Sequence, residues 1–396
     1  MARQGAAIPR YRTFSGPSLL SQGFRPFFLV AGVWSALAVL LWIGWLLGGW
    51  PLPLAMPGVL WHGHEMIFGY LVAALAGFLM TAVPNWTGRM PLQGRALAAL
   101  TVIWGVGRLA MALGGALPTT VVAVADLAFL ACLLAVMGRE IVAGRNWRNL
   151  PILGALTLLL VANVTVHASA AFGFDPRIGL RLSVAMFVVL IALIGGRIVP
   201  SFTRNWLVKR GHDRHPAKYG HGDQAALLIT LAAALSWTAA PSSGLTGVLA
   251  GAAALANAWR LSRWRGLPTW REPLLLILHL GYAWLPLGFA LMAAASFSAE
   301  VPASAALHAM TAGAMGAMTL AVMTRTSLGH TGRALTADMA TTVSYVLVIA
   351  AAVLRIAGAL APSAASVLHA AAGAAWVAAF AVFVAAYAPK LVAPRP

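Results

Sequence analysis

Long apolar runs alternate with short polar or Gly/Pro-rich breaks from one end of the chain to the other. Each run has about 20 residues, the length that an α-helix needs to cross the hydrocarbon core of a bilayer. The pattern therefore predicts an all-α integral membrane protein of about twelve transmembrane helices. The runs fall at 28–48, 60–83, 96–115, 119–138, 150–172, 181–200, 223–241, 243–259, 273–295, 302–323, 337–360 and 364–388.

The composition agrees with this pattern, because 61% of the residues are hydrophobic and only 9% are charged. A soluble globular chain carries about 25% charged residues. The connections are too short for a soluble domain, so residues 1–396 are predicted to form a single transmembrane domain with the lipid bilayer as its partner. The formal charge of +18 falls in the gaps between the runs, which indicates topology rather than a nucleic-acid partner.

The basic residues are concentrated in alternate gaps, whereas the intervening gaps hold only Arg177 and Arg181. Loops rich in Lys and Arg stay in the cytoplasm. Because the bias persists along the whole chain, both termini are predicted to be cytoplasmic. The cations that carry this argument include the N-terminal Arg3, Arg10 and Arg12 and the C-terminal Lys390 and Arg395.

The second and tenth runs resemble each other, which suggests an internal repeat. His64 precedes Gly69 by five positions, and His308 precedes Gly313 by the same number. The sixth run ends with a related Val-Pro motif, so the pattern predicts three consecutive four-helix units. Parallel repeats of this kind place cofactor or substrate sites at the interfaces between units. The units extend roughly over 20–140, 141–262 and 263–396.

Histidines inside the predicted helices are the main candidates for chemistry. An ionisable side chain in a bilayer costs roughly 2.5–3.5 kcal/mol, so it is retained mainly when it is partnered or functional. A neutral imidazole is a good ligand for haem iron and for copper. A hydrogen bond to a neighbouring helix is the alternative for any single one. The topology places His279 in the inner half of the bilayer, and the outer half holds His62, His64, His167, His308 and His369.

The segment Trp61–Met66 carries two histidines and an acid in four positions. Residues i and i+2 of an α-helix are about 200° apart, so His62 and His64 cannot bind one metal from one face of a regular helix. They are expected to serve two different centres, or one of them supports the other's centre. Glu65 is a candidate for orienting an imidazole N–H or for proton delivery, with a water-exposed interfacial carboxylate as the alternative.

Four further residues limit the chemistry. Arg108 and Asp126 fall inside neighbouring helices and are predicted to form a buried ion pair. Arg197 is a candidate for neutralising haem propionates, although its cytoplasmic side favours a topological role. Cys132 is the single cysteine, which excludes disulfides and iron–sulfur clusters within the chain and leaves any haem bound non-covalently.

These motifs resemble, in order and over nearly the whole chain, the NnrS family of bacterial membrane proteins of the nitric oxide response. The resemblance is carried by Arg25–Phe28, Trp61–Gly69, Pro84–Gly88, Gly195–Trp206, His279–Trp284, His308–Gly313 and Leu328–Arg333. It implies an inner-membrane protein that contains haem and copper and is linked to denitrification and nitrosative stress. The repeat also resembles the bundle of the haem-copper oxidase catalytic subunit. However, the sixth run has no histidine and the seventh has no His-His pair, which argues against oxygen reduction at the usual binuclear centre.

The leading hypothesis is a b-type haem between the second and tenth helices, with His64 or His62 and His308 as its axial ligands. His167 and His279 are then candidates for copper or for supporting roles. The expected function is binding or redox conversion of nitric oxide, or of another small diatomic ligand, near the periplasmic side. The alternative is a transporter for protons or metal ions, with a histidine-lined path and no redox cofactor.

Overall fold

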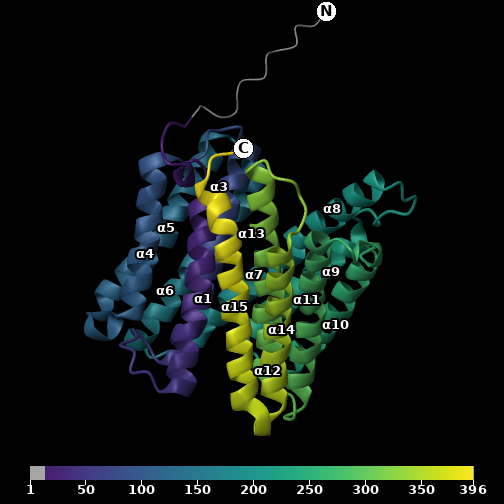
Figure 1. Ribbon diagram of the computed structural model, residues 1–396. Helices are drawn as coiled ribbons and strands as arrows, with labels where there is room; N and C mark the ends of the chain where they lie inside the picture. Colours follow the sequence, from purple (N-terminus) through teal and green to yellow (C-terminus); the bar gives the residue numbers. More distant parts are fainter. Residues whose placement is uncertain (1–13, 396) are drawn as a thin grey trace, which may run out of the picture.

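The computed structural model describes residues 14–395, so the predicted topology cations Arg3, Arg10 and Arg12 lie outside the described residues. Within 14–395 the chain is helical and has no β-strand. It folds into a bundle of twelve helical rods (Figure 1), in the number and order of the predicted apolar runs. The all-α class is therefore confirmed.

Nine rods are single α-helices and three are composite. The single helices are α1 (Phe24–Gly48), α4 (Gly94–Ala112), α5 (Thr119–Ala143), α6 (Leu150–Phe172), α9 (His221–Ala239), α10 (Gly244–Ser262), α11 (Pro273–Phe297), α14 (Met339–Leu360) and α15 (Ala365–Val392). The composite rods are α2 (Gly58–His64), η2 (Glu65–Leu71) and α3 (Val72–Thr87); α7 (Arg177–Leu190), η5 (Ile191–Gly195) and α8 (Gly196–Lys209); and α12 (Ala303–His308), η7 (Ala309–Gly316) and α13 (Ala317–His330). Short 3₁₀ turns lie at η1 (Ser18–Leu20), η3 (Gly114–Ala116), η4 (Trp147–Asn149), η6 (Leu267–Thr269) and η8 (Pro362–Ala364).

Ten of the rods are long and apolar enough to cross a membrane on their own, and the chain is a multi-pass membrane protein. The other two, α9 and α10, have 19 residues each, which is about 28 Å of helix and close to the thickness of the hydrocarbon core. They pack against each other, with α9 also against α7 and α10 against α11. Large apolar side chains such as Leu40, Val124 and Leu255 remain exposed on the bundle, as expected of a lipid-facing surface.

Each composite rod contains a π-helical segment, namely η2, η5 or η7. A π turn is wider than an α turn and is frequent at functional sites. These segments occupy the second, sixth and tenth rods, the three that the sequence comparison related to one another. They begin directly after His64 in the second rod and after His308 in the tenth. The division into three four-helix units stays a prediction, and the shared π segment accords with it.

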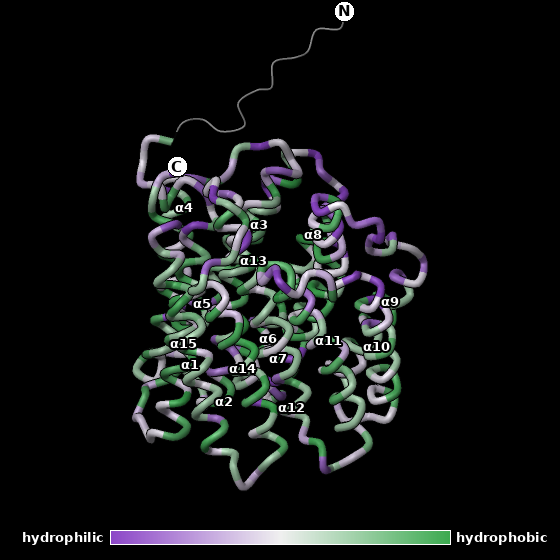
Figure 2. The backbone as a smooth tube through the Cα atoms, turned by 45° about the vertical axis from the view of Figure 1, so that its right-hand side comes forward, coloured by the Kyte–Doolittle hydropathy of each residue, from purple (hydrophilic) through white to green (hydrophobic). Residues whose placement is uncertain are grey.

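The second and tenth rods are neighbours in the bundle. Tyr70 of η2 is fully buried and hydrogen-bonds to Thr319 of α13, which joins the two rods directly. The first and last rods, α1 and α15, lie side by side (Figure 1). Rod two also packs closely on α1, because a Cβ at Gly69 would collide with the indole of Trp34. The helices α2 and α12, which end at His64 and His308, lie toward the lower end of the bundle in Figure 2.

Candidate functional site

The first polar group inside the bundle lies between rods two, three, four and five. We call it the His64 network. Its members are His64, Glu65, Arg108, Asp126, Asn163 and His167. His64 and Glu65 are 0% exposed, and Arg108 and Asp126 are 3% and 2% exposed. The network is therefore removed from both lipid and water.

Arg108 is the cation at the centre of this network. One terminal nitrogen donates to Glu65 Oε1 at 2.6 Å, and the other pairs with Asp126. The predicted ion pair between Arg108 and Asp126 is confirmed, and Glu65 joins it as a second carboxylate. Two carboxylates on one guanidinium leave one negative charge to be balanced, which matters because an unpaired buried charge is costly.

The imidazole of His64 balances this negative charge. Its Nδ1 lies 2.9 Å from Glu65 Oε1, and its Nε2 lies 2.9 Å from Asn163 Oδ1 and 3.1 Å from Asp126 Oδ2. Asn163 Nδ2 donates to Asp126, which fixes Oδ1 of the amide as the atom facing the imidazole. Because both ring nitrogens face acceptors, both carry a proton and donate. In this arrangement His64 has no free nitrogen for a haem iron.

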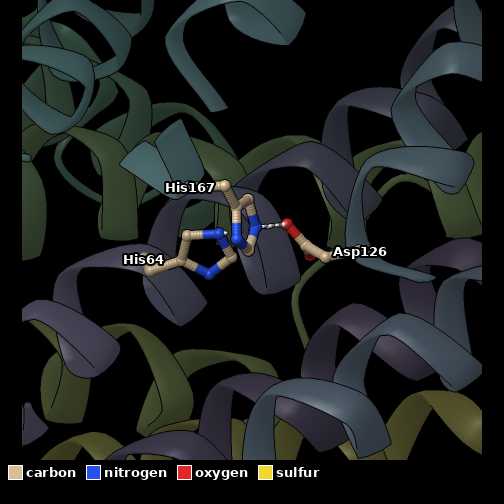
Figure 3. A group of neighbouring side chains, drawn as sticks. All are labelled: His64, Asp126 and His167. Carbon is tan, nitrogen blue, oxygen red and sulfur yellow. Dashed lines mark hydrogen bonds and ion pairs between the residues drawn. The ribbon is translucent and has the colours of Figure 1, made fainter. Parts of the chain in front are cut away.

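His167 completes the network from α6. Its Nε2 donates to Asp126 Oδ2 at 2.9 Å, and its ring centroid lies 5.5 Å from that of His64 (Figure 3). One ligand atom each from His64, Asp126 and His167 lies within 4.8 Å of the others. Within residues 14–395 this is the one group of three or more His, Cys, Asp or Glu side chains with such spacing. Two imidazoles and one carboxylate form a donor set that fits a copper or zinc ion.

The second polar group lies where rods two, ten, eleven and twelve approach one another. We call it the His308 cluster, and its members are His62, His308, Arg355 and His369. His308 lies close enough to the other three for their charges to interact, and Arg355 is likewise close to His62. Ile356 of α14 packs on Ala305 and Ala309 of the tenth rod, which sets this turn of α14 beside His308.

The imidazoles of this cluster keep nitrogens free. His308 Nδ1 donates to the backbone oxygen of Ser304 at 2.7 Å, so its Nε2 keeps a lone pair. His62 Nδ1 is buried and has no hydrogen-bond partner among residues 14–395. Its ring stacks on Trp42, with centroids 4.8 Å apart and planes 13° apart. The i, i+2 spacing of His62 and His64 thus separates them into two groups, as the helix geometry predicts.

Two predicted site residues lie in other surroundings. His279 of α11 donates from Nε2 to the hydroxyl of Thr203, at 2.9 Å, and packs against Gly266. The Thr203 hydroxyl itself donates to Val199, so it accepts from the imidazole. Arg197 is exposed on α8, beyond the π segment of its rod, whereas His308 precedes the π segment of the tenth rod. Neither residue joins the His64 network or the His308 cluster.

Two arginines near these sites are not among the predicted site residues. Arg355 is half-buried on α14 and interrupts the apolar run at 337–360, a signal that the insertion cost makes conspicuous. Arg260, just beyond the predicted apolar run at 243–259, is fully buried at the end of α10. It donates to Asp223 at 3.1 Å and to the Tyr282 hydroxyl at 2.8 Å, and it also caps the carbonyl of Ala192 in η5.

Fold and sites together define a polytopic α-helical membrane protein with two separate histidine groups in its bundle, one buried and one half-buried. The chain belongs to the NnrS family, because the family model described as NnrS protein matches residues 18–395. No curated protein matches it. Membership of this family points to a membrane protein of the nitric oxide response.

Proposed function

We propose that the protein binds a b-type haem through His62 and His308 and handles nitric oxide at that centre, by binding or by redox conversion. The observation that carries the proposal is the His308 cluster itself. Two imidazoles that lie 246 positions apart in the chain approach one another around a single arginine, and each keeps a ring nitrogen without a hydrogen bond. When bound, the haem would supply an iron that takes up nitric oxide in place of one of its two imidazole ligands.

The donor chemistry supports His62 rather than His64 as the partner of His308. Both nitrogens of His64 already donate to carboxylate and amide oxygens. The buried Nδ1 of His62 lacks any partner in the described chain, and such an atom is costly unless something binds it. The bond from His308 to Ser304 fixes the tautomer of that ring, as backbone carbonyls do for ligating histidines.

We also propose that the His64 network holds copper through His64, His167 and Asp126. The network carries two carboxylates and one guanidinium, and the second proton of His64 balances its charge. A copper(I) ion has the same charge as the proton that it would replace between His64 and Asp126. Imidazole nitrogens suit copper, and the asparagine amide would remain beside the ion.

The protein is proposed to lie in the bacterial inner membrane with both termini in the cytoplasm and the His308 cluster toward the periplasm. Hydrophilic segments gather at the upper end of the bundle in Figure 2, around the ends of α8 and α13. Loops there contain most of the basic residues, in line with the rule that cationic loops stay inside. A C-terminal green fluorescent protein fusion is expected to fluoresce, and a C-terminal alkaline phosphatase fusion to be inactive. The reverse pattern would contradict this orientation.

Absorption spectroscopy with metal analysis of the purified protein tests the proposed function. The wild type is expected to show the Soret band of a b-type haem and to contain iron. His62→Ala and His308→Ala are each expected to lose the band, whereas His279→Ala keeps it, because His279 bonds only to Thr203 in this structure. Retention of haem in both of the first two variants would refute the assignment.

A proton or metal-ion transporter is the second candidate, and the His64 network is the observation that favours it. Five ionisable groups from four rods are linked there inside the membrane, which is typical of proton relays. A colourless wild-type protein without iron, combined with ion flux in proteoliposomes that Asp126→Asn abolishes, would support this reading instead.

A further inference from the structure

Arg355 is a half-buried arginine of α14 that, unlike Arg108 and Arg260, has no acidic partner within residues 14–395. Arg108 pairs with Glu65 and Asp126, and Arg260 pairs with Asp223. No carboxylate within residues 14–395 forms an ion pair with Arg355. A membrane arginine without a counter-ion is expensive, so its retention indicates a partner that is not part of the described chain.

The guanidinium of Arg355 is nevertheless held in place. Its Nη1 donates to Nε2 of His369 at 2.9 Å, its one hydrogen bond to the described chain. The ring of His369 occupies a notch that Gly358 leaves on α14, one turn beyond Arg355. A Cβ at Gly358 would come within 2.7 Å of Cδ2 and 2.9 Å of Nε2 of that ring. The remaining N–H groups of Arg355 are therefore held in a fixed orientation but donate no hydrogen bond to residues 14–395.

The surroundings of Arg355 favour an anion. His62, His308 and His369 are the side chains whose charges act on it or on one another, and none of them can supply a negative charge. The neutral forms of His62 and His308 are the ones that bind iron, so the cluster with haem ligands in place carries one net positive charge. A planar fork of N–H donors matches a carboxylate particularly well.

We propose that Arg355 binds a propionate carboxylate of the haem held by His62 and His308, and that His369 positions Arg355 for this contact. The inference rests on the proposed function, since haem brings the carboxylate. Arg355, beside the two imidazoles, would thus neutralise a haem propionate. The sequence made Arg197 a candidate for this role. The propionate would give the guanidinium the negative charge that no carboxylate of residues 14–395 provides.

Reconstitution with haem and with haem dimethyl ester, whose propionates are uncharged, tests this contact. Apoprotein from cells deprived of haem precursors is titrated with each form, and the Soret band gives the dissociation constant. The wild type is expected to bind haem about ten- to a hundredfold more tightly than the ester, the range of a charge-assisted hydrogen bond. Arg355→Gln is expected to bind both forms equally, with the affinity that the wild type has for the ester.

Three further variants sharpen the result. Arg355→Lys keeps the charge and is expected to restore part of the preference for haem, which also shows that the site still folds. His369→Gln is expected to reduce the preference without abolishing it. Arg197→Gln, at an exposed position on α8, is the matched control and should behave as the wild type.

The possible failures are distinguishable. If Arg355→Gln keeps the full preference for haem, or if the wild type has none, the contact with Arg355 is refuted while the haem site stands. An arginine that only reaches toward lipid headgroups would give this result. If the wild type binds neither form, the proposed function is refuted and this inference with it.

Discussion

The His64 network and the His308 cluster both adjoin the start of a π segment but differ in how their charges are balanced. In the network, His64, Glu65, Arg108 and Asp126 bond mainly to one another, and the charges of these four side chains sum to zero. In the cluster, His62 and His308 keep free nitrogens, and Arg355 has no counter-ion among residues 14–395. A charge-balanced network stabilises the fold without a ligand and would take copper only in exchange for a proton, whereas the cluster has open donor groups for a ligand.

The contrast is informative because His64 and His308 occupy equivalent positions, each directly before a π segment. Side chains on the neighbouring helices account for the difference in hydrogen bonding between these two imidazoles. Asp126 on α5 and Asn163 on α6 face His64, but among residues 14–395 His308 hydrogen-bonds only to the carbonyl of Ser304. Corresponding positions in two rods thus acquire different hydrogen-bond partners from the helices packed around them.

The largest expected effect comes from removing one acid of the charge-balanced network. Asp126→Asn leaves Arg108 and the imidazolium of His64 with Glu65 alone as their shared counter-charge. Breaking a buried ion pair on one side costs about 3–5 kcal/mol, so the apoprotein in detergent should unfold at a clearly lower temperature. His308→Ala, in the cluster that has no ion pair among residues 14–395, should change the apoprotein's unfolding temperature little. Equal decreases in unfolding temperature for the two substitutions would contradict this difference between the network and the cluster.

Metal content should divide between the two groups. His167→Ala is expected to lose copper and keep haem, and His62→Ala to lose haem and keep copper, because these histidines belong to different groups. Inductively coupled plasma mass spectrometry together with the Soret band measures both. Joint loss of the two metals in each variant would mean that the two groups form one centre.

A smaller effect is expected at the link between rods two and ten. Tyr70→Phe removes the hydroxyl that bonds to Thr319. A net loss of about 0.5–1.5 kcal/mol is expected, as for a single hydrogen bond. Thermal unfolding should show it as a small shift, together with a slight change in the position of the Soret band if the rods frame the haem. A shift as large as that of Asp126→Asn would place the main stabilising contact here instead.

The smallest effect concerns an ion pair outside the membrane spans. Hydrogen bonds from Thr341 and the nearby ammonium of Lys390 lower the pKa of Asp338 from 3.8 to about 2. A carboxyl with a lowered pKa in the folded state stabilises the protein above its unfolded pKa and loses this effect as the pH falls toward 2. The difference in unfolding temperature between wild type and Asp338→Ala should therefore be constant above pH 5 and shrink below pH 4. A pH-independent difference would show that the charge of Asp338 does not contribute.

Much of the fold was predictable because each crossing requires its own apolar run, and the runs gave all twelve rods. The π segments were not predictable, since an inserted turn leaves the apolar pattern almost unchanged. Helix periodicity separated His62 from His64, but it does not reveal which helix faces each of them. The surroundings of Arg355 were not predictable, because the contact with His369 and the lack of a carboxylate partner among residues 14–395 are both tertiary features.

Electron paramagnetic resonance of the oxidised, purified protein tests the central assignment most directly, because it reports the ligands of the iron itself. The account predicts a low-spin ferric signal of iron with two imidazole ligands in the wild type and in His64→Gln. That signal should be replaced by a high-spin signal, or lost, in both His62→Gln and His308→Gln. An unchanged low-spin signal in the His62 and His308 variants would contradict the assignment.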